Sequence, residues 1–567
     1  MRWRDLRLRR ETLKDDAVAG LVLGLQSVPS GLATGLLAGV NPLAGLHGYL
    51  VGTVTGAMAT SATFMIVQGT GAMAMVIADI PAVHTSDGGA RALSTLAILT
   101  GVVMLAAGLL KLGSLLRFVS NAVMVGFLNA VGVNIALGQL ANLTGYAAPG
   151  PNRIARALET LMSPGQLHWH SIAVGLVTLA LILALQRTRV GTLGLVVAVV
   201  VTSGAVMALG WQDVAILNDL GVTIRGLPTL AWPLLSQVPA LLVPALSLAF
   251  VGLVQGAGIS ATYANPDTSY PDPSRDFMGQ GAANVASGFL RGMPVGGSLS
   301  ASALNRTAGA RSRQAPVIAG IVMVVVMVAL GELIGHVAMP ALAGLLILVG
   351  VRTLKPAGLS AVWRTGTVQK TVLGVTFLLT MLIPLHYAVL AGVGLSVVLH
   401  VVRDSNQVVI RRRVYHPDGG VIEVDPPAEL PGSEVVVLQP YGSLFFAAAP
   451  VFEAALPAVG EASRNAIVIL RLRGRSDLGT TFMDVVRRYA VSLREVGSKL
   501  VIVSDSDRIL EQLVVTGITE TIGASNVYAG DERVGATVRR AYDDAVRWVA
   551  ERTDGTIGGS SPPPGHN

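Results

Sequence analysis

The sequence contains no cysteine and is poor in charged and aromatic side chains. Of its 567 residues, 13% are charged and 5% are aromatic, whereas 52% are hydrophobic. The lack of cysteine excludes disulfide bonds, thiolate metal sites and a cysteine nucleophile. Soluble domains carry about a quarter charged residues, and the mean hydropathy here is +0.61. The composition therefore predicts an integral membrane protein that contacts lipid.

The positive charge of the chain is concentrated next to apolar segments. The formal net charge is +7, but its location argues against a nucleic-acid partner. Residues 1–16 are rich in arginine and precede a long apolar run. We expect these residues to form a cytosolic basic N-terminus beside anionic lipid.

Fourteen apolar segments follow, in two halves of seven. The first repeat, about 17–209, holds segments at 17–38, 45–66, 69–80, 92–110, 116–137, 171–185 and 192–209. The second repeat, about 240–403, holds segments at 240–261, 278–290, 299–308, 316–336, 340–351, 371–383 and 387–402. An even number of crossings returns the chain to its starting side, so we expect both termini to be cytoplasmic.

The charges of the loops favour this order. Cytoplasmic loops are enriched in lysine and arginine, and every second loop of this chain is basic. The basic loops hold Lys111, Arg117, Arg187, Arg189, Arg306, Arg311, Arg313, Arg352, Lys355, Arg364, Lys370 and Arg403. On the opposite side, Arg153 and Arg156 are the main exceptions.

Two of the segments are too short and polar to cross a bilayer. A spanning helix needs about 20 mostly apolar residues, which neither 69–80 nor 299–308 provides. Each follows a stretch rich in glycine and small residues, QGTGAMA from Gln68 and MPVGGSLSAS from Met293. Irregular backbone at membrane depth survives only inside protein or beside a water-filled cavity. The sequence therefore predicts two broken half-helices in corresponding repeats.

This pair of half-helices predicts an anion site near the membrane midplane. A helix N-terminus carries about half a positive charge and binds anions, and the free N–H groups would lie around Leu299 to Ser302. The alternative interpretation is a cytosolic loop, or small residues that let membrane helices pack closely.

After residue 403 the pattern becomes that of a soluble protein. Residues 404–432 are predicted as a polar linker and residues 433–552 as an α/β domain. Strand patterns at EVVVLQP, AIVILRLR and KLVIVSD alternate with helical patterns at 480–496, 507–516 and 533–551. Residues 553–567, which contain SSPPPG, are predicted as a disordered tail. Because no catalytic triad, metal-ligand cluster or phosphate-binding loop stands out, we expect neither an enzyme nor a cofactor.

Four stretches together resemble the sulfate permease (SulP) family of anion transporters, which end in a STAS domain. They are DDAVAGLVLGLQSVPSGLATGLLAGVNPLAGLHG from Asp15, QGTGAMA from Gln68, MGQGAANVASGFLRGMPVGGSLSASALNRTAGARS from Met278, and the C-terminal domain. The resemblance implies a polytopic α-helical membrane protein with a 7+7 inverted repeat, core and gate domains, and a cytosolic α/β STAS domain. It further implies a homodimer, with the STAS domain available to a cytosolic regulatory partner.

The family's anion site lies between the N-termini of the third and tenth helices. The matching positions are Gly69, Thr70, Gly71 and Ala72 in one wall, Leu299, Ser300 and Ala301 in the other, and Gln26, Ser30 and Gln255 as neutral donors nearby. Many members carry arginine directly after the matching serine, where this chain has Ala301. A coupling carboxylate of several relatives is Gln255 here, which cannot titrate, and this favours exchange or uniport over symport.

The resemblance therefore predicts a secondary active transporter of an inorganic anion in the cytoplasmic membrane. Its substrate would be sulfate or a related anion such as bicarbonate or chloride, carried by elevator-type alternating access. An anion channel, an anion sensor that signals through the STAS domain, and a dicarboxylate transporter are the alternatives. High unitary leak currents would favour the channel, and a partner whose affinity tracks anion concentration would favour the sensor.

Overall fold

The computed structural model describes residues 12–86, 88–113, 120–220, 227–416, 420–444, 446–474, 478–530, 533 and 535–557. Most of the basic N-terminus, Arg117 and the end of the predicted tail lie outside these residues. The chain divides into two compact units, Met1–Ser396 and Val397–Asn567. Each unit is described by itself.

Each predicted apolar segment of the first unit coincides with one helix. The first seven are α1 (Leu13–Leu37), α2 (Pro42–Ala59), α3 (Gly71–Ala78), α4 (Gly89–Leu109), α5 (Asn121–Gly138), α8 (Trp169–Leu185) and α9 (Gly194–Leu209). The second seven are α10 (Val238–Thr262), α11 (Pro273–Phe289), α12 (Leu299–Thr307), α13 (Gln314–Gly335), α14 (Met339–Thr353), α16 (Thr367–Leu382) and α17 (Leu385–Ser405). Seven helical stretches of the described chain are long and apolar enough to cross a membrane.

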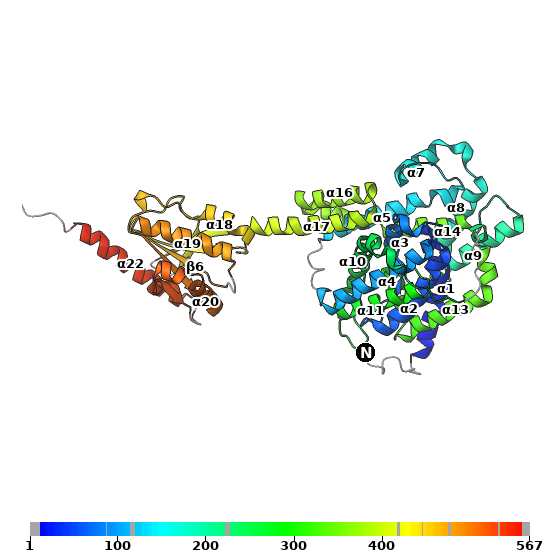
Figure 1. Ribbon diagram of the computed structural model, residues 1–567, viewed down its shortest axis with the longest axis horizontal. Helices are drawn as coiled ribbons and strands as arrows, with labels where there is room; N and C mark the ends of the chain where they lie inside the picture. Colours follow the sequence, from blue (N-terminus) through cyan, green and yellow to red (C-terminus); the bar gives the residue numbers. More distant parts are fainter. Residues whose placement is uncertain are drawn as a thin grey trace, which may run out of the picture. The chain divides into compact units, whose positions relative to one another are not determined.

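These helices pack into two bundles. In bundle 1, α1 lies against α2 and α13, while α11 lies against α2 and α4 and α10 lies against α4. In bundle 2, α5 lies against α14 and α16, and α8 lies against α9 and α14. The bundles meet where α3 contacts α5 and α1 contacts α9 and α14. Figure 1 shows α3 in the interior of this unit.

Two extended segments cross in the interior of bundle 1, immediately before the half-helices. β1 (Val67–Gln68) precedes α3 and β2 (Gly296–Gly297) precedes α12. They pair antiparallel, with Val67 opposite Gly297 and Gln68 opposite Gly296, and all four residues are buried. The half-helices are thus confirmed, but strands of two residues are too short to show a period of two in the sequence.

Glycine pairs let two full helices approach this crossing. A Cβ at Gly52 of α2 would lie 2.7 Å from the Val67 carbonyl oxygen, and one at Gly56 would lie 2.6 Å from the Val67 side chain. On the β2 side, a Cβ at Gly297 would lie 2.8 Å from the Cα of Gly256 in α10. Such spacing of small residues permits close backbone contact between membrane helices, so larger side chains here would force the crossing apart.

One polar face of α11 satisfies the backbone that leads into β2. Asn284 accepts a hydrogen bond from the Val295 N–H at 2.8 Å and donates one to the Val295 carbonyl at 2.6 Å. Gln280 accepts from the Gly297 N–H at 2.9 Å, and Ser287 donates to the Met293 carbonyl at 2.8 Å. Buried backbone groups need such partners, and the spacing of the three side chains places them on one helix face.

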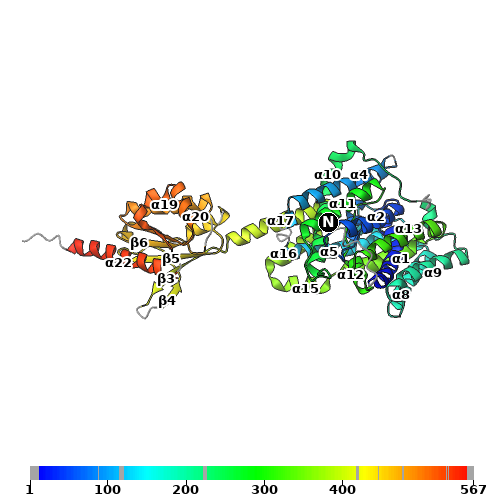
Figure 2. The same cartoon turned by 90° about the horizontal axis from the view of Figure 1, so that it is seen from below.

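The second unit is a six-stranded sheet with helices on both faces. Its order is β4-β3-β5-β6-β7-β8. The bounds are β3 (Val409–Tyr415), β4 (Val421–Val424), β5 (Val435–Tyr441), β6 (Ile467–Arg471), β7 (Lys499–Ser504) and β8 (Val527–Ala529). β5 to β8 are parallel, and β3 pairs antiparallel with β4 and β5. In Figure 2, α19 (Thr480–Glu495) and α20 (Asp507–Val515) lie on the opposite side of the sheet from α22 (Ala536–Ile557).

Three predicted boundaries are wrong. The segment 404–432 is not a linker, because β3 and β4 complete the sheet within it. The first helix begins at Leu13 rather than 17, and Asp16 in its first turn accepts hydrogen bonds from the N–H groups of Arg311 and Ser312. The last helix extends to Ile557, into the predicted tail. In the first two cases, long-range pairing or packing stabilises residues that look polar locally.

The support from α11 gives a stability prediction with a matched control. Asn284→Leu removes both partners of Val295, and each unsatisfied buried backbone group costs about 1–3 kcal/mol. We expect a clearly lower midpoint of thermal unfolding in detergent. Asn305 is equally buried, but neither of its side-chain polar atoms has a partner among the described residues. Asn305→Leu should therefore lower the midpoint of thermal unfolding little or not at all. An equal decrease of the midpoint in both variants would contradict this assignment.

Candidate functional site

Both half-helices begin with a hydroxyl cap at the end of a buried strand. Thr70 is the N-cap of α3, and its hydroxyl accepts from the Met73 N–H at 3.3 Å. Ser298 is the N-cap of α12, and its hydroxyl accepts from the Ala301 N–H at 3.3 Å. A single cap satisfies only part of a first turn. The N–H groups of Gly71, Ala72, Leu299 and Ser300 have no partner inside their helices, so four donors remain at this place.

The predicted residues of the two walls differ in accessibility. Leu299 is 40% exposed and Ser300 is also exposed, so the start of α12 faces open space. Thr70 and Gly71 are half-buried, whereas Gly69, Ala72 and Ala301 are buried. The last three therefore shape the site through their backbone, while Ser300 and Thr70 present hydroxyl groups near its surface.

The next serine of α12 has a different role from Ser300. The Ser302 side chain is fully buried, and its hydroxyl accepts a hydrogen bond from the Ile66 N–H at 2.9 Å. The Ser298 N–H in turn donates to the Ile66 carbonyl at 2.8 Å. Ser302 therefore holds the crossing together and is not free for a ligand, whereas the Ser300 hydroxyl is 3.4 Å from that of Ser298.

The predicted neutral donors come from helices that flank both half-helices. α1, which carries Gln26 and Ser30, and α10, which carries Gln255, each contact α3 and α12. The side-chain oxygens of Gln26 and Gln255 are buried and have no partner among the described residues. Ser30 is half-buried, and its carbonyl accepts from the Thr34 hydroxyl at 2.7 Å. The side-chain oxygens of Gln26 and Gln255 are therefore not held by a hydrogen bond to another described residue.

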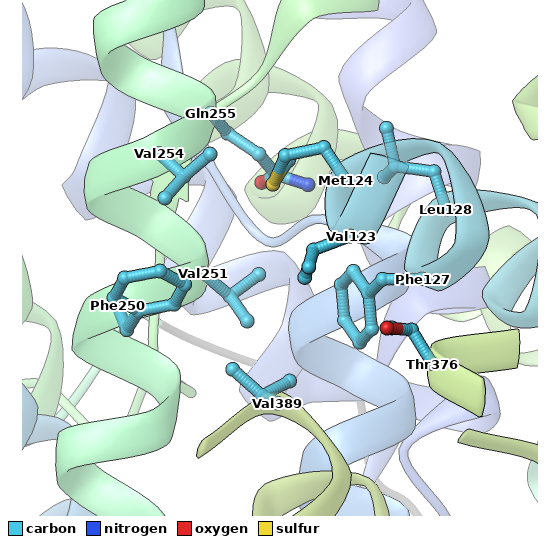
Figure 3. A pocket seen from close by; sticks show the side chains of 10 residues that line it. All are labelled: Val123, Met124, Phe127, Leu128, Phe250, Val251, Val254, Gln255, Thr376 and Val389. Carbon is cyan, nitrogen blue, oxygen red and sulfur yellow. The ribbon is translucent and has the colours of Figure 1, made fainter. Parts of the chain in front are cut away.

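Gln255 also reaches an apolar cavity between the two bundles. Figure 3 shows its amide directed from α10 toward Met124 of α5. Phe127 of α5, Thr376 of α16 and Val389 of α17 line the opposite side. The cavity is apolar apart from Gln255 and Thr376, so it suits helix movement better than recognition of a charged ligand.

Gln68 belongs to the site's support, and the sequence analysis gave it no role. Its amide nitrogen donates to the Ser27 hydroxyl at 2.9 Å and to the Thr53 hydroxyl at 3.0 Å. It is 2% exposed. The position of Gln68 in the short QGTGAMA stretch could have indicated this role. An amide that is buried inside a membrane protein needs hydrogen-bond partners. It fixes β1 to α1 and α2.

α12 carries no charged side chain in its first turn, which holds Leu299, Ser300 and Ala301. Arg306 lies near the opposite, C-terminal end of α12, where its guanidinium sits 4.9 Å from the Phe64 ring centroid. Among the described residues, no group of three His, Asp or Glu side chains could hold a metal ion. The arrangement can therefore bind an anion through N–H groups, hydroxyls and helix dipoles.

An ion pair that the sequence analysis missed joins the two bundles. Asp79, at the end of α3, accepts a hydrogen bond from Arg153 at 2.6 Å and from the Leu385 N–H at 2.9 Å. Arg153 begins α7 (Arg153–Met162), and Leu385 begins α17. Arg153 is an exception to the pattern of basic residues in every second loop. Its ion pair with Asp79 accounts for a basic residue at this position. The carboxylate of Asp79 follows a short apolar segment, and this position in the sequence could have indicated that it has a charged partner.

Comparison with known proteins places these features in a family. The sulfate permease family matches residues 13–376. The protein named "Putative sulfate transporter YvdB" of Bacillus subtilis is 24% identical over 523 residues, which cover 91% of this chain and 96% of the relative. The bicarbonate transporter BicA of a Picosynechococcus species is 26% identical, over 70% of this chain and 71% of the relative.

A solved structure shares the fold along nearly the whole chain. The murine Solute Carrier 26 family member A9 anion transporter, in the inward-facing state, superposes with a TM-score of 0.83 at 19% identity. The match covers 97% of this chain and 93% of the other. Together with the half-helix pair, the family match leads to one conclusion: this chain belongs to the sulfate permease family, whose members are transporters rather than enzymes.

Proposed function

We infer that this protein is a secondary active transporter that binds an inorganic anion between the N-termini of α3 and α12. The observation that carries this inference is the β1–β2 pair, in which Val67 lies opposite Gly297. Because each strand leads directly into a half-helix, two positive helix ends begin in the interior of the same bundle. The relatives named as sulfate and bicarbonate transporters support an oxyanion substrate.

The absence of a fixed charge at this site bears on energy coupling. Gln255 and Ala301 stand where a titratable acid and an arginine occur in other members, so neither proton binding nor a permanent cation is available there. The site's positive potential would come from the uncapped N–H groups of the two half-helices. This arrangement favours exchange of one anion for another, independent of sodium and proton gradients.

The two bundles suit an elevator-type movement. The anion site lies within bundle 1, and the apolar cavity beside Gln255 lies where bundle 1 faces α5, α16 and α17 of bundle 2. An apolar boundary with few hydrogen bonds allows one rigid body to slide past another. We place the first unit in the cytoplasmic membrane, where α3 and α12 reach only partway across, with both termini and the STAS-like α/β unit in the cytoplasm. The homodimer and a regulatory partner remain predictions of the family resemblance.

Substitution of Ser300 tests the site directly. Ser300→Glu places a fixed negative charge beside the anion, and repulsion of about 4 kcal/mol at 4 Å separation would reduce occupancy more than about a hundredfold. We expect loss of labelled sulfate uptake into sulfate-loaded proteoliposomes without cation gradients. If the parent protein does not transport sulfate, labelled bicarbonate replaces sulfate as the probe.

The control places the same charge elsewhere on the chain. Ser360 is exposed in α15 (Pro356–Thr365), so Ser360→Glu should leave uptake unchanged. Thermal unfolding of both variants should match the parent protein. Undiminished uptake by Ser300→Glu would contradict the site, and uptake that requires a sodium or proton gradient would contradict exchange.

The ion pair between Asp79 and Arg153 gives a test of the movement. Asp79 belongs to α3 in bundle 1, whereas Arg153 and Leu385 belong to segments that pack with bundle 2. Any sliding of the bundles must break these contacts. The two side chains are 16% and 20% exposed, so the pair should contribute about 1 kcal/mol to the state seen here.

Asp79→Asn or Arg153→Gln should therefore shift the conformational balance away from this state, roughly fivefold. The expected result is a change in the apparent affinity for external anion. This change should have the same size in each single variant and in the double variant. Asp213→Asn removes a more exposed pair, with His170, that does not join the two bundles and should have no effect. Simple addition of the two single effects in the double variant would show that the pair does not act as a unit.

A further inference from the structure

A basic cavity lies at the carboxyl ends of β6 and β7 in the α/β unit. Arg471 ends β6, Arg473 follows it, and Asp505 follows β7. Thr537, in the first turn of α22, and Arg533 complete the part of the wall that bears polar groups. Ligands of parallel sheets commonly bind outside the carboxyl ends of the strands, and this cavity occupies that position.

Two buried polar groups at this cavity have unused hydrogen-bonding capacity. Arg471 is 8% exposed, and one of its terminal nitrogens donates to the Gln439 side chain at 2.7 Å, but its Nε has no partner among the described residues. Thr537 is 5% exposed, and its hydroxyl also has no partner there. Buried polar groups are nearly always paired, so two such groups lining one cavity indicate a ligand that accepts hydrogen bonds.

The charges around the cavity specify the sign of that ligand. Three arginines line it among the described residues, and the carboxylate of Asp505 lies 3.5 Å from the Nε of Arg473 and accepts from the Gly474 N–H at 3.3 Å. Burial lowers the pKa of Arg471, and the neighbouring cations Arg413 and Arg473 lower it further. The first turn of α22 adds uncapped N–H groups and the positive end of a helix dipole. An anion would relieve the repulsion among these cations.

We propose that this cavity binds a tetrahedral oxyanion, the phosphate group of a free ion or of a small metabolite, between Arg471, Arg473 and the N-terminus of α22. Arginine matches such a group with two parallel hydrogen bonds, and the Thr537 hydroxyl would bind a further oxygen. The site is separate from the one between α3 and α12, and the proposal does not depend on transport. It would let a cytosolic oxyanion act on the α/β unit.

Hydrogen–deuterium exchange on the full-length protein in detergent tests this proposal. The probes are inorganic phosphate, sulfate and ADP at constant ionic strength, with chloride as the reference anion. Bound oxyanion should slow exchange in residues 469–474 and 535–545. Protection by inorganic phosphate identifies the free ion as sufficient, and protection by ADP alone identifies a phosphate-bearing metabolite. No protection by any probe would overturn the proposal.

Two variants and two controls show whether the named side chains are responsible. Arg471→Gln and Thr537→Val should each weaken the apparent affinity about tenfold or more. Arg487→Gln changes an exposed arginine of α19, on the other face of the sheet, and should change nothing. Ser300→Glu should retain the protection, since it affects only the transport site. Parent-like affinity in either folded variant would overturn the assignment of its side chain, so the test still stands if one of the two folds poorly.

Discussion

The backbone pairing of β1 with β2 is the contact on which the rest of the membrane unit depends. Val67 and Gln68 from one half of the chain meet Gly296 and Gly297 from the other half. This crossing stops the two preceding helices short and lets α3 and α12 start inside the bundle. Without it, the two half-helices would not both begin inside the bundle, and the anion site that we propose between them would not exist.

The surroundings of the crossing show how this buried arrangement is stabilised. Glycines of α2 and α10 allow close approach, and the polar face of α11 satisfies the backbone before β2. Gln68 ties β1 to its neighbours through two hydroxyls. The polar side chains described here around the crossing thus serve the scaffold. The first-turn N–H groups and the hydroxyl of Ser300 remain for a ligand, so the proposed anion site would need no fixed cation.

Much of this architecture could be predicted from the sequence, because hydrophobic length and interruptions by glycine are local signals. The fourteen helices, which include the two half-helices at 69–80 and 299–308, follow from such patterns. The pairing of Val67 with Gly297 and of Asp79 with Arg153 could not be predicted, because each joins residues far apart in the chain. β3 and β4 were missed because the arginine-rich β3 and the four-residue β4 look like a linker until the sheet provides partners.

Cysteine protection at position 300 tests the central claim most directly, and the cysteine-free chain makes this measurement clean. Ser300→Cys introduces a single thiol at the start of α12, and Ser360→Cys introduces one on an exposed helix away from the site. The account predicts that the transported anion slows labelling of the first thiol by a water-soluble reagent, with half-protection near its transport affinity, and leaves the second unchanged. Labelling at position 300 that ignores a saturating concentration of the transported anion would contradict binding between α3 and α12.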